Sequence, residues 1–199
     1  MSLAATVLNK RIIPVARGLD ARSAPALAGA LAAGGLDIIE ITVESASGFD
    51  AIAAVVGGET TVGAGTVVTI DQARRAVDAG AEFLVTPHLD VALLEWAGAN
   101  GVFMIPGALT PTEVFAARRY EPPAVKLFPA HLGGPEYLRS LLGPYPYLRL
   151  IPTGGVTGDN ARAYLEAGAA AIGVGGWLTS SSDLSMVTRR ARQLVAQVV

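Results

Sequence analysis

Lys126 is the residue whose type and surroundings point most directly to covalent chemistry. Of the fifteen Lys and Arg residues in the chain, only two, Lys10 and Lys126, are lysines, and Lys126 lies in the apolar segment Ala124–Phe128. A buried amine can lose its proton near neutral pH, which a guanidinium cannot, and a neutral amine attacks carbonyl carbons. The alternative is a lysine that packs its aliphatic stem on a strand and keeps its ammonium in water. The residue alone leaves both interpretations open.

Glu40 is a second charged residue among apolar neighbours, in the segment Ile38–Val43. Loss of hydration favours the neutral form of a carboxyl group, and a carboxyl group in such surroundings can both accept and donate protons. A structural ion pair with Lys126 or Arg17 is the alternative. We favour a proton-transfer role, because an isolated buried carboxylate is costly.

Arg17 and Thr66 each stand at the end of an apolar segment. A guanidinium in that place suits a carboxylate or phosphate, which it can hold through two parallel hydrogen bonds, although a solvated arginine is the simpler reading of Arg17. Thr66 follows Gly63-Ala64-Gly65, where the glycines allow a backbone or a substrate to approach closely. The spacing fits neither the dinucleotide fingerprint nor the phosphate loop.

Two glycine pairs predict a phosphate site. Gly154 and Gly155 follow one predicted strand directly after Thr153, and Gly175 and Gly176 follow the next. Glycines there expose backbone N–H groups to an anion, and barrels often hold phosphate in these two loops. Two tight turns without a ligand are the alternative.

The only two histidines, His88 and His131, also follow predicted strands. No acidic ligand motif accompanies them, so we expect no metal site. We interpret both as rim or water-positioning residues.

The elements that must position these residues alternate along the chain. Short apolar runs with little polar alternation are typical of parallel strands buried on both faces, and alanine-rich stretches between them predict helices. We predict eight strands at Ile12–Arg17, Ile38–Val43, Thr61–Thr66, Phe83–Thr86, Phe103–Gly107, Ala124–Phe128, Arg149–Thr153 and Ala170–Val174. Helices are expected at Ala24–Ala33, Gln72–Ala79, Val91–Asn100 and Ala161–Ala167, and a capping box is predicted at Thr110-Pro111-Thr112-Glu113.

Eight such units in 199 residues favour an α/β fold of the (β/α)8 TIM-barrel type, closed at one end by a short helix in the first ten residues. A doubly wound open sheet is the competitor. It would more often carry a phosphate loop after its first strand, where this chain has Gly18-Leu19-Asp20. In a barrel, the polar residues at the strand ends gather at one mouth.

Composition narrows the class of protein. We expect one globular domain over residues 1–199, because 51% of the residues are hydrophobic and no linker interrupts the chain. A net charge of −2 gives little support to nucleic-acid binding, and no apolar run is long enough to span a membrane. The absence of cysteine and of a signal-like start is compatible with a cytoplasmic protein.

Taken together, these segments resemble the KDPG/KHG aldolases, the 2-keto-3-deoxy-6-phosphogluconate aldolase family. The resemblance extends from Pro14–Arg17 to Gly173–Gly176. It rests on segments that occur in order at successive strand ends, namely Glu40-Ile41-Thr42, Val62–Thr66, Thr86-Pro87-His88, Ile105-Pro106-Gly107, Lys126–Pro129 and Pro152–Val156.

The resemblance implies a class I aldolase that reversibly cleaves a 2-keto-3-deoxy-6-phospho-sugar acid, KDPG, to pyruvate and glyceraldehyde 3-phosphate, with KHG as a further candidate substrate. It implies that Lys126 forms the Schiff base, that Glu40 transfers protons, and that Thr66 and Pro87 line the pyruvyl pocket. Phe128 and Thr153 join the expected substrate-binding set. The iminium serves as electron sink, so no metal or cofactor is expected, and a homotrimer is implied.

Three positions depart from the family pattern. Glu44 stands where some members have an arginine for the substrate carboxylate, and we transfer that role to Arg17, as in other members. His131 replaces a frequent acidic residue, and Gly176 replaces a serine that often binds phosphate. The Arg17-Gly18 pair is shared with 6-phosphogalactonate aldolases, so that substrate remains an alternative. A non-covalent sugar-phosphate isomerase or epimerase, and a non-catalytic sugar-phosphate sensor, also remain open.

Overall fold

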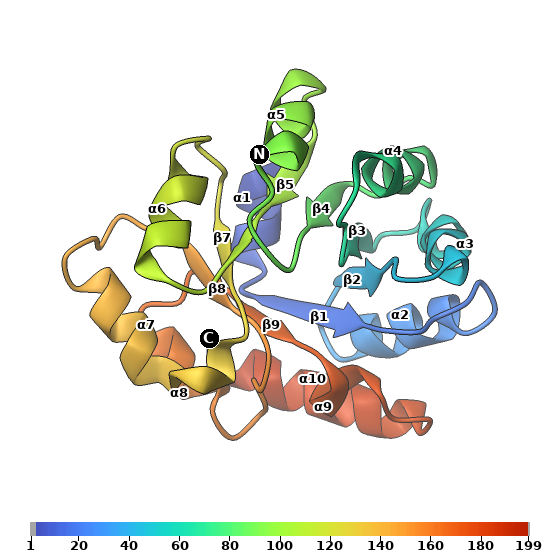
Figure 1. The fold of residues 1–199 in the computed structure, drawn as a ribbon. Helices are drawn as coiled ribbons and strands as arrows, with labels where there is room; N and C mark the ends of the chain where they lie inside the picture. Colours follow the sequence, from blue (N-terminus) through green and yellow to red (C-terminus); the bar gives the residue numbers. More distant parts are fainter. Residues whose placement is uncertain (1–2, 199) are drawn as a thin grey trace.

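The computed structural model describes residues 3–198, except for the side chains of Ala4 and Val198. Strands and helices alternate, with the strands at the centre and most helices around them (Figure 1). The strands are β1 (Ile12–Ala16), β2 (Ile38–Thr42), β3 (Thr61–Gly65), β4 (Phe83–Val85), β5 (Phe103–Ile105), β6 (Gly107–Ala108), β7 (Val125–Leu127), β8 (Leu150–Pro152) and β9 (Ile172–Val174). The helices are α1 (Leu3–Asn9), α2 (Ala24–Ala33), α3 (Ala46–Val55), α4 (Ile70–Asp78), α5 (Val91–Ala99), α6 (Pro111–Arg118), α7 (Gly134–Leu142), α8 (Ala161–Glu166), α9 (Gly176–Thr179) and α10 (Leu184–Val198), with a 3-10 turn η1 (Ala130–Leu132).

The strands form two parallel sheets. Six strands pair in the order β5-β4-β3-β2-β1-β9, and three pair in the order β6-β7-β8. Only Pro106 separates β5 from β6, and its lack of an N–H interrupts the strand there. The carbonyl of Pro106 still accepts a hydrogen bond from Lys126 N at 2.9 Å. At the other seam, an isolated parallel bridge joins Thr153 to Gly173.

The α/β class and the parallel strands predicted from the sequence are confirmed. The continuous eight-stranded sheet of a TIM barrel is not what the hydrogen-bonded ladders show, since they divide into a six-stranded and a three-stranded sheet. The predicted strand Phe103–Gly107 is divided at Pro106. Several predicted strands also extend too far at their carboxyl ends, so Arg17, Thr66 and Thr153 lie just beyond the strands rather than within them.

The predicted helix in the first ten residues is confirmed, because α1 packs against the amino-terminal ends of the strands. Val7 and Leu8 belong to an apolar cluster inside the curved sheets. Its other buried members come from the strands and their edges, namely Ile13, Ile38, Phe83, Val85, Ile105, Ala124, Ile151 and Ala171. A larger cluster fills the layer between the strands and the surrounding helices.

This inner cluster determines the direction of the two candidate catalytic side chains. Successive side chains of a strand point to opposite faces, so every second residue shares a face. Ile38 lies in the inner cluster, and Glu40 therefore points inward two residues further along β2. By the same alternation, Lys126 follows Ala124. Both charged side chains lie on the inner side, toward the carboxyl ends of the strands.

Local signals at the helix starts also hold. Thr110 Oγ1 accepts a hydrogen bond from Glu113 N, and the Glu113 carboxylate accepts one from Thr110 N, which completes the predicted capping box at α6. None of the helices described over residues 3–198 is long and apolar enough to cross a membrane.

Candidate active site

The ammonium of Lys126 and the carboxylate of Glu40 meet inside the molecule. Lys126 Nζ lies 3.5 Å from Glu40 Oε1, and the two side chains are only 3% and 4% exposed. Lys126 is therefore not a lysine that extends its charged end into water, and that alternative from the sequence is wrong. The structural ion pair that the sequence left open for Glu40 does form, and it joins the two residues for which chemistry was predicted.

Glycines make room for this pair. Glu40 lies opposite Gly63 on β3, and the next residue on that face of β3 is Gly65. A Cβ atom at position 65 would lie 2.0 Å from Glu40 Oε1, so only glycine leaves space for the carboxylate. Lys126 is paired with Gly107 on β6. The Gly63-Ala64-Gly65 segment thus has a packing role that the sequence suggested only in general terms.

The Glu40 carboxylate is incompletely satisfied. Its Oε1 atom is buried and has no hydrogen-bond partner among the described residues, although Lys126 Nζ lies 3.5 Å away. Buried polar atoms in folded proteins are nearly always hydrogen-bonded, and an exception calls for an explanation. A donor group of a bound substrate would provide this oxygen with the missing hydrogen bond.

Aromatic and backbone groups border the amine on its other side. Lys126 Nζ lies 5.2 Å from the centre of the Phe128 ring, within the range of a cation–π contact. The ring also packs on Gly154, where an added Cβ would lie 3.3 Å from a ring carbon. Phe128 and Gly154 thereby connect Lys126 to the loop after β8.

Arg17, Thr66 and Glu44 form a polar group in the loops after β1, β2 and β3. Arg17 Nη1 donates a hydrogen bond to Thr66 Oγ1 at 3.4 Å and lies 4.0 Å from Glu44 Oε1. Thr66 has a φ of +60°, a left-handed conformation that is uncommon for a residue with a Cβ. Thr66 follows Gly65 directly, so this polar group adjoins Glu40. Glu44, which stands where some family members have an arginine, is exposed and is a direct neighbour of Arg17.

Pro87 is held by a residue that the sequence reading did not select. Thr86 is buried, and its Oγ1 donates to the carbonyl of His88 and accepts a hydrogen bond from Gly107 N at 3.1 Å. A Cβ at Gly107 would lie 2.4 Å from the backbone of Pro87. Thr86 thus fixes the turn after β4 against β6, the strand that pairs with β7 beside Lys126. In the sequence, a threonine at the end of the predicted strand Phe83–Thr86 was the feature that could have indicated this role.

The two predicted glycine loops follow β8 and β9, as expected. Gly154 and Gly155 have φ values of +94° and +75°, which favour glycine at both positions. Gly175 precedes the short helix α9, and Gly176 is its first residue. The bridge from Thr153 to Gly173 brings the start of one loop beside the strand that leads into the other. Thr153 itself is buried, and its hydroxyl donates to Ile151 O at 3.3 Å.

The two histidines lie at the surface. His88 and His131 are both exposed, whereas Lys126 and Glu40 are buried. His131 packs its Cβ against Gly155, where a side chain would lie 2.5 Å away. Across residues 3–198, no group of three or more His, Cys, Asp or Glu residues could hold a metal ion.

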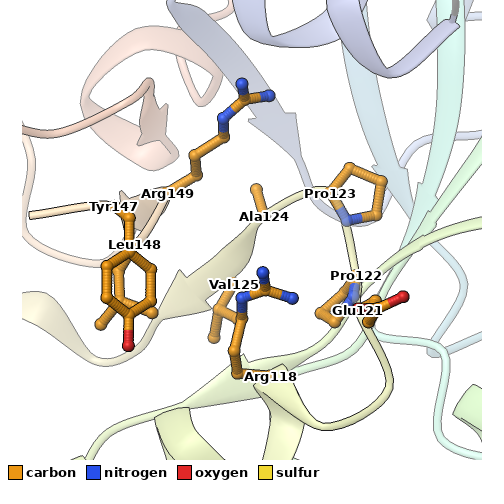
Figure 2. A pocket seen from close by; sticks show the side chains of 9 residues that line it. All are labelled: Arg118, Glu121, Pro122, Pro123, Ala124, Val125, Tyr147, Leu148 and Arg149. Atoms are coloured by element: carbon orange, nitrogen blue, oxygen red, sulfur yellow. The ribbon is translucent and has the colours of Figure 1, made fainter. Parts of the chain in front are cut away.

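A separate pocket opens at the other ends of β7 and β8. Residues before and at the start of these strands line it, and Arg118 and Arg149 are its only cations. Figure 2 shows that the Arg118 guanidinium lies among the lining side chains, whereas that of Arg149 extends away from them, so the two do not converge on one point. Neither Lys126 nor Glu40 lines this pocket, so it is distinct from the site built around them.

Comparisons with known proteins agree with this arrangement. The family model described as KDPG and KHG aldolase matches residues 3–191. The 2-dehydro-3-deoxy-phosphogluconate aldolase of Treponema pallidum is 34% identical over 191 residues, which cover 92% of this chain and 91% of the relative. The 2-dehydro-3-deoxy-6-phosphogalactonate aldolase of Escherichia coli is 32% identical over 191 residues, covering 94% and 92%.

A solved structure gives the same result at the level of the fold. The KDPG aldolase of Legionella pneumophila, captured with pyruvate as a covalent carbinolamine intermediate, superposes with a TM-score of 0.90 and 28% identity. The match covers 97% of this chain and 98% of that one. The isomerase and sensor alternatives have no support among these relatives. The chain belongs to the KDPG and KHG aldolase family and is a class I aldolase, an aldehyde-lyase.

Proposed function

We propose that Lys126 forms the Schiff base and Glu40 transfers the protons in the reversible cleavage of KDPG to pyruvate and glyceraldehyde 3-phosphate. The observation that carries this assignment is the contact between the two buried side chains, 3.5 Å apart, with one carboxylate oxygen left without a hydrogen bond. An amine and a proton-transfer group at that separation can act on adjacent atoms of one bound ketone.

The cleavage proceeds through a covalent intermediate. The neutral amine of Lys126 attacks the C2 ketone to give a carbinolamine, which loses water to become an iminium ion. Glu40, acting through a water molecule, accepts the proton of the C4 hydroxyl as the C3–C4 bond breaks. The electron pair of that bond moves into the iminium to form an enamine, and the aldehyde leaves. Glu40 then returns a proton to C3, and hydrolysis of the new iminium releases pyruvate and restores the amine.

The loops around the pair provide the binding groups. Arg17 lies at the carboxyl end of β1 with most of its donors unused, and we assign the substrate carboxylate to it. Thr66, Pro87, Phe128 and Thr153 are assigned to the walls of the pyruvyl pocket.

The phosphate end is assigned to the two glycine loops. Gly154, Gly155, Gly175 and Gly176 are the residues proposed to offer backbone N–H groups there. The positive φ values of Gly154 and Gly155 support this assignment, because such a loop can turn its N–H groups toward an anion.

The architecture proposed for this chemistry is a single (β/α)8 barrel domain over residues 1–199. The short break between β5 and β6 and the bridge between Thr153 and Gly173 support closure of the two sheets into one barrel. We further propose a cytoplasmic homotrimer, which rests on the family resemblance and on the composition.

Trapping of the intermediate tests the assignment. Incubation with pyruvate and borohydride should reduce the iminium and leave a stable adduct, which peptide mass analysis should locate at Lys126. Lys10, the only other lysine, is an internal control and should remain unmodified. An adduct at Lys10, or none on the native enzyme, would contradict the assignment.

The C4 epimer is the second candidate substrate, a 2-keto-3-deoxy-6-phosphogalactonate. The observation that favours it is the similar identity of the phosphogluconate and phosphogalactonate relatives, 34% and 32%. Initial rates with both epimers, and with unphosphorylated analogues, should be compared by coupling pyruvate release to lactate dehydrogenase. The epimer with the higher kcat/KM is the preferred substrate.

A further inference from the structure

We infer that Glu44 is a specificity-determining residue that competes with the substrate carboxylate for Arg17. This inference rests on the proposed function, in which Arg17 binds that carboxylate. Glu44 lies two residues beyond the end of β2, on the same side of the molecule as Arg17 and Thr66. Its carboxylate is the one anionic group found within ion-pair distance of Arg17 in the described part of the chain.

The ion pair between Glu44 and Arg17 is close enough to affect substrate binding and weak enough for a substrate carboxylate to displace Glu44. The two charged atoms are 4.0 Å apart, with no hydrogen bond between the side chains, and the side chains are 39% and 56% exposed. An exposed pair of this kind has a weak net free energy, commonly below 1 kcal/mol. An incoming carboxylate that makes two short hydrogen bonds to the guanidinium would replace it.

Arg17 has the donors for such an exchange. A guanidinium carries five N–H groups in a planar fork, and here the one hydrogen bond from the side chain goes to Thr66 Oγ1 at 3.4 Å. That bond holds Arg17 beside Thr66, next to Gly65 and therefore next to Glu40. Glu44 Oε1 lies nearest to the same Nη1 atom that donates to Thr66 Oγ1. The substrate carboxylate and the Glu44 carboxylate therefore require the same donors.

The consequence is a lower affinity for the substrate without an effect on bond cleavage. In the described part of the chain no ion pair joins Glu44 to Lys126, so its charge acts on binding through Arg17. Displacement of an exposed ion pair of this strength corresponds to roughly two- to fivefold weaker binding of the substrate. Glu44 thereby biases the enzyme toward substrates whose carboxylate binds Arg17 strongly enough to displace it.

Steady-state kinetics on Glu44→Gln test the inference. This substitution keeps the shape of the side chain and removes its charge. KM for the keto-acid substrate should fall by about two- to fivefold, with kcat within about twofold of the native value. Glu95→Gln, on the exposed face of α5, makes the same change in net charge far from Arg17 and should leave KM unchanged. A KM for Glu44→Gln that equals or exceeds the native value would overturn the inference.

A double-mutant cycle separates this mechanism from simple repulsion of the substrate. In the Arg17→Gln background, removal of the Glu44 charge should change KM by no more than about 1.5-fold, because the shared guanidinium is absent. An undiminished effect in that background would overturn competition for Arg17. The borohydride adduct at Lys126 should form in all of these variants, so failure of the inference remains distinct from failure of the proposed function.

Discussion

The two lysines of this chain form ion pairs of opposite character. Lys10 Nζ lies 2.5 Å from both carboxylate oxygens of Asp37, and the side chains are 31% and 45% exposed. Lys126 Nζ lies 3.5 Å from one oxygen of Glu40, and the side chains are 3% and 4% exposed. The exposed pair, Lys10–Asp37, is joined by hydrogen bonds, whereas the buried pair, Lys126–Glu40, is not.

The difference in burial and geometry indicates that the Lys10–Asp37 pair stabilises the fold, whereas the Lys126–Glu40 pair does not. Taking two charges out of water costs several kcal/mol per ion, and only good hydrogen-bond geometry recovers that cost. The Lys10–Asp37 pair connects the residues just before β1 and β2 at little cost. The Lys126–Glu40 pair does not have the geometry that would compensate for its burial. The role that we propose for Lys126 and Glu40 in the reaction would account for a pair that packing alone would disfavour.

Replacing each lysine by arginine gives the sharpest test of this comparison. Lys126→Arg keeps a positive charge but removes the amine, so the iminium cannot form and kcat should fall by at least about 10⁴-fold. Lys10→Arg keeps the exposed ion pair and should leave kcat within about twofold. Pyruvate release in the presence of KDPG measures both. Turnover by Lys126→Arg at the native rate would break the comparison, because it would make both lysines structural.

Replacing the two carboxylates by amides extends the comparison to the acid partners. Glu40→Gln cannot transfer protons, and kcat should fall by about 10²- to 10⁴-fold, the usual contribution of general acid–base catalysis. Asp37→Asn should leave kcat unchanged. Peptide mass analysis after borohydride should still detect the pyruvate adduct at Lys126 in Glu40→Gln. Native turnover in that variant would assign proton transfer to another group.

Substitution of Gly65 tests whether catalysis requires the space around the buried Lys126–Glu40 pair. In Gly65→Ala the new methyl group would lie 2.0 Å from Glu40 Oε1, so the carboxylate must move away from the amine. We expect kcat to fall by about ten- to a hundredfold and the free energy of unfolding to fall by about 1–3 kcal/mol. Gly98→Ala in α5 is the matched control, because its Cβ would meet no atom within 4 Å. That control should be neutral or stabilising by up to about 1 kcal/mol.

Much of this arrangement follows from the sequence, because apolar strands alternate with alanine-rich helices and Lys126 and Glu40 lie within such strands. The face of the strand that each side chain occupies is not readable, since these strands are buried on both faces. Their contact is not readable, since it joins residues 86 positions apart (126 minus 40) and depends on how the sheets curve. Several predicted strands end too late because the residue just after the strand is β-branched as well, as Val43, Thr66 and Thr153 are.

The parts that the sequence did not reveal are contacts between loops. The proximity of Glu44 to Arg17 and the hydrogen bond of Thr86 to Gly107 depend on loop conformations rather than on periodicity. The left-handed φ of Thr66 is a similar case, because threonine rarely adopts it and no local pattern announces it. Such contacts are set by the packing of neighbouring strands.

Glu113 provides the test with the smallest expected effect. It contrasts with Glu40 because its carboxylate is exposed and hydrogen-bonded, whereas that of Glu40 is buried and lacks a partner at Oε1. Glu113 lies at the surface, yet its carboxylate accepts hydrogen bonds from Thr110 N at 2.7 Å, Leu109 N at 2.9 Å and Thr110 Oγ1 at 2.9 Å. The backbone hydrogen bond from Thr110, followed by that from Leu109, lowers the pKa of Glu113 below its ordinary value of 4.5. A carboxylate with a lowered pKa stabilises the folded state above pH 4.5, and this contribution is lost as the pH falls through the folded-state pKa.

Glu113→Gln should therefore lower the free energy of unfolding by no more than about 1 kcal/mol at pH 7, the usual size of a capping contribution at a helix start. Thermal or urea unfolding as a function of pH should show the difference from the native enzyme shrinking below pH 4.5, because the native carboxyl group then becomes protonated as well. The kcat of Glu113→Gln at pH 7 should equal that of the native enzyme. A variant that lost activity while keeping its stability would show that a well-bonded surface carboxylate also serves the reaction, and the contrast with Glu40 would then fail.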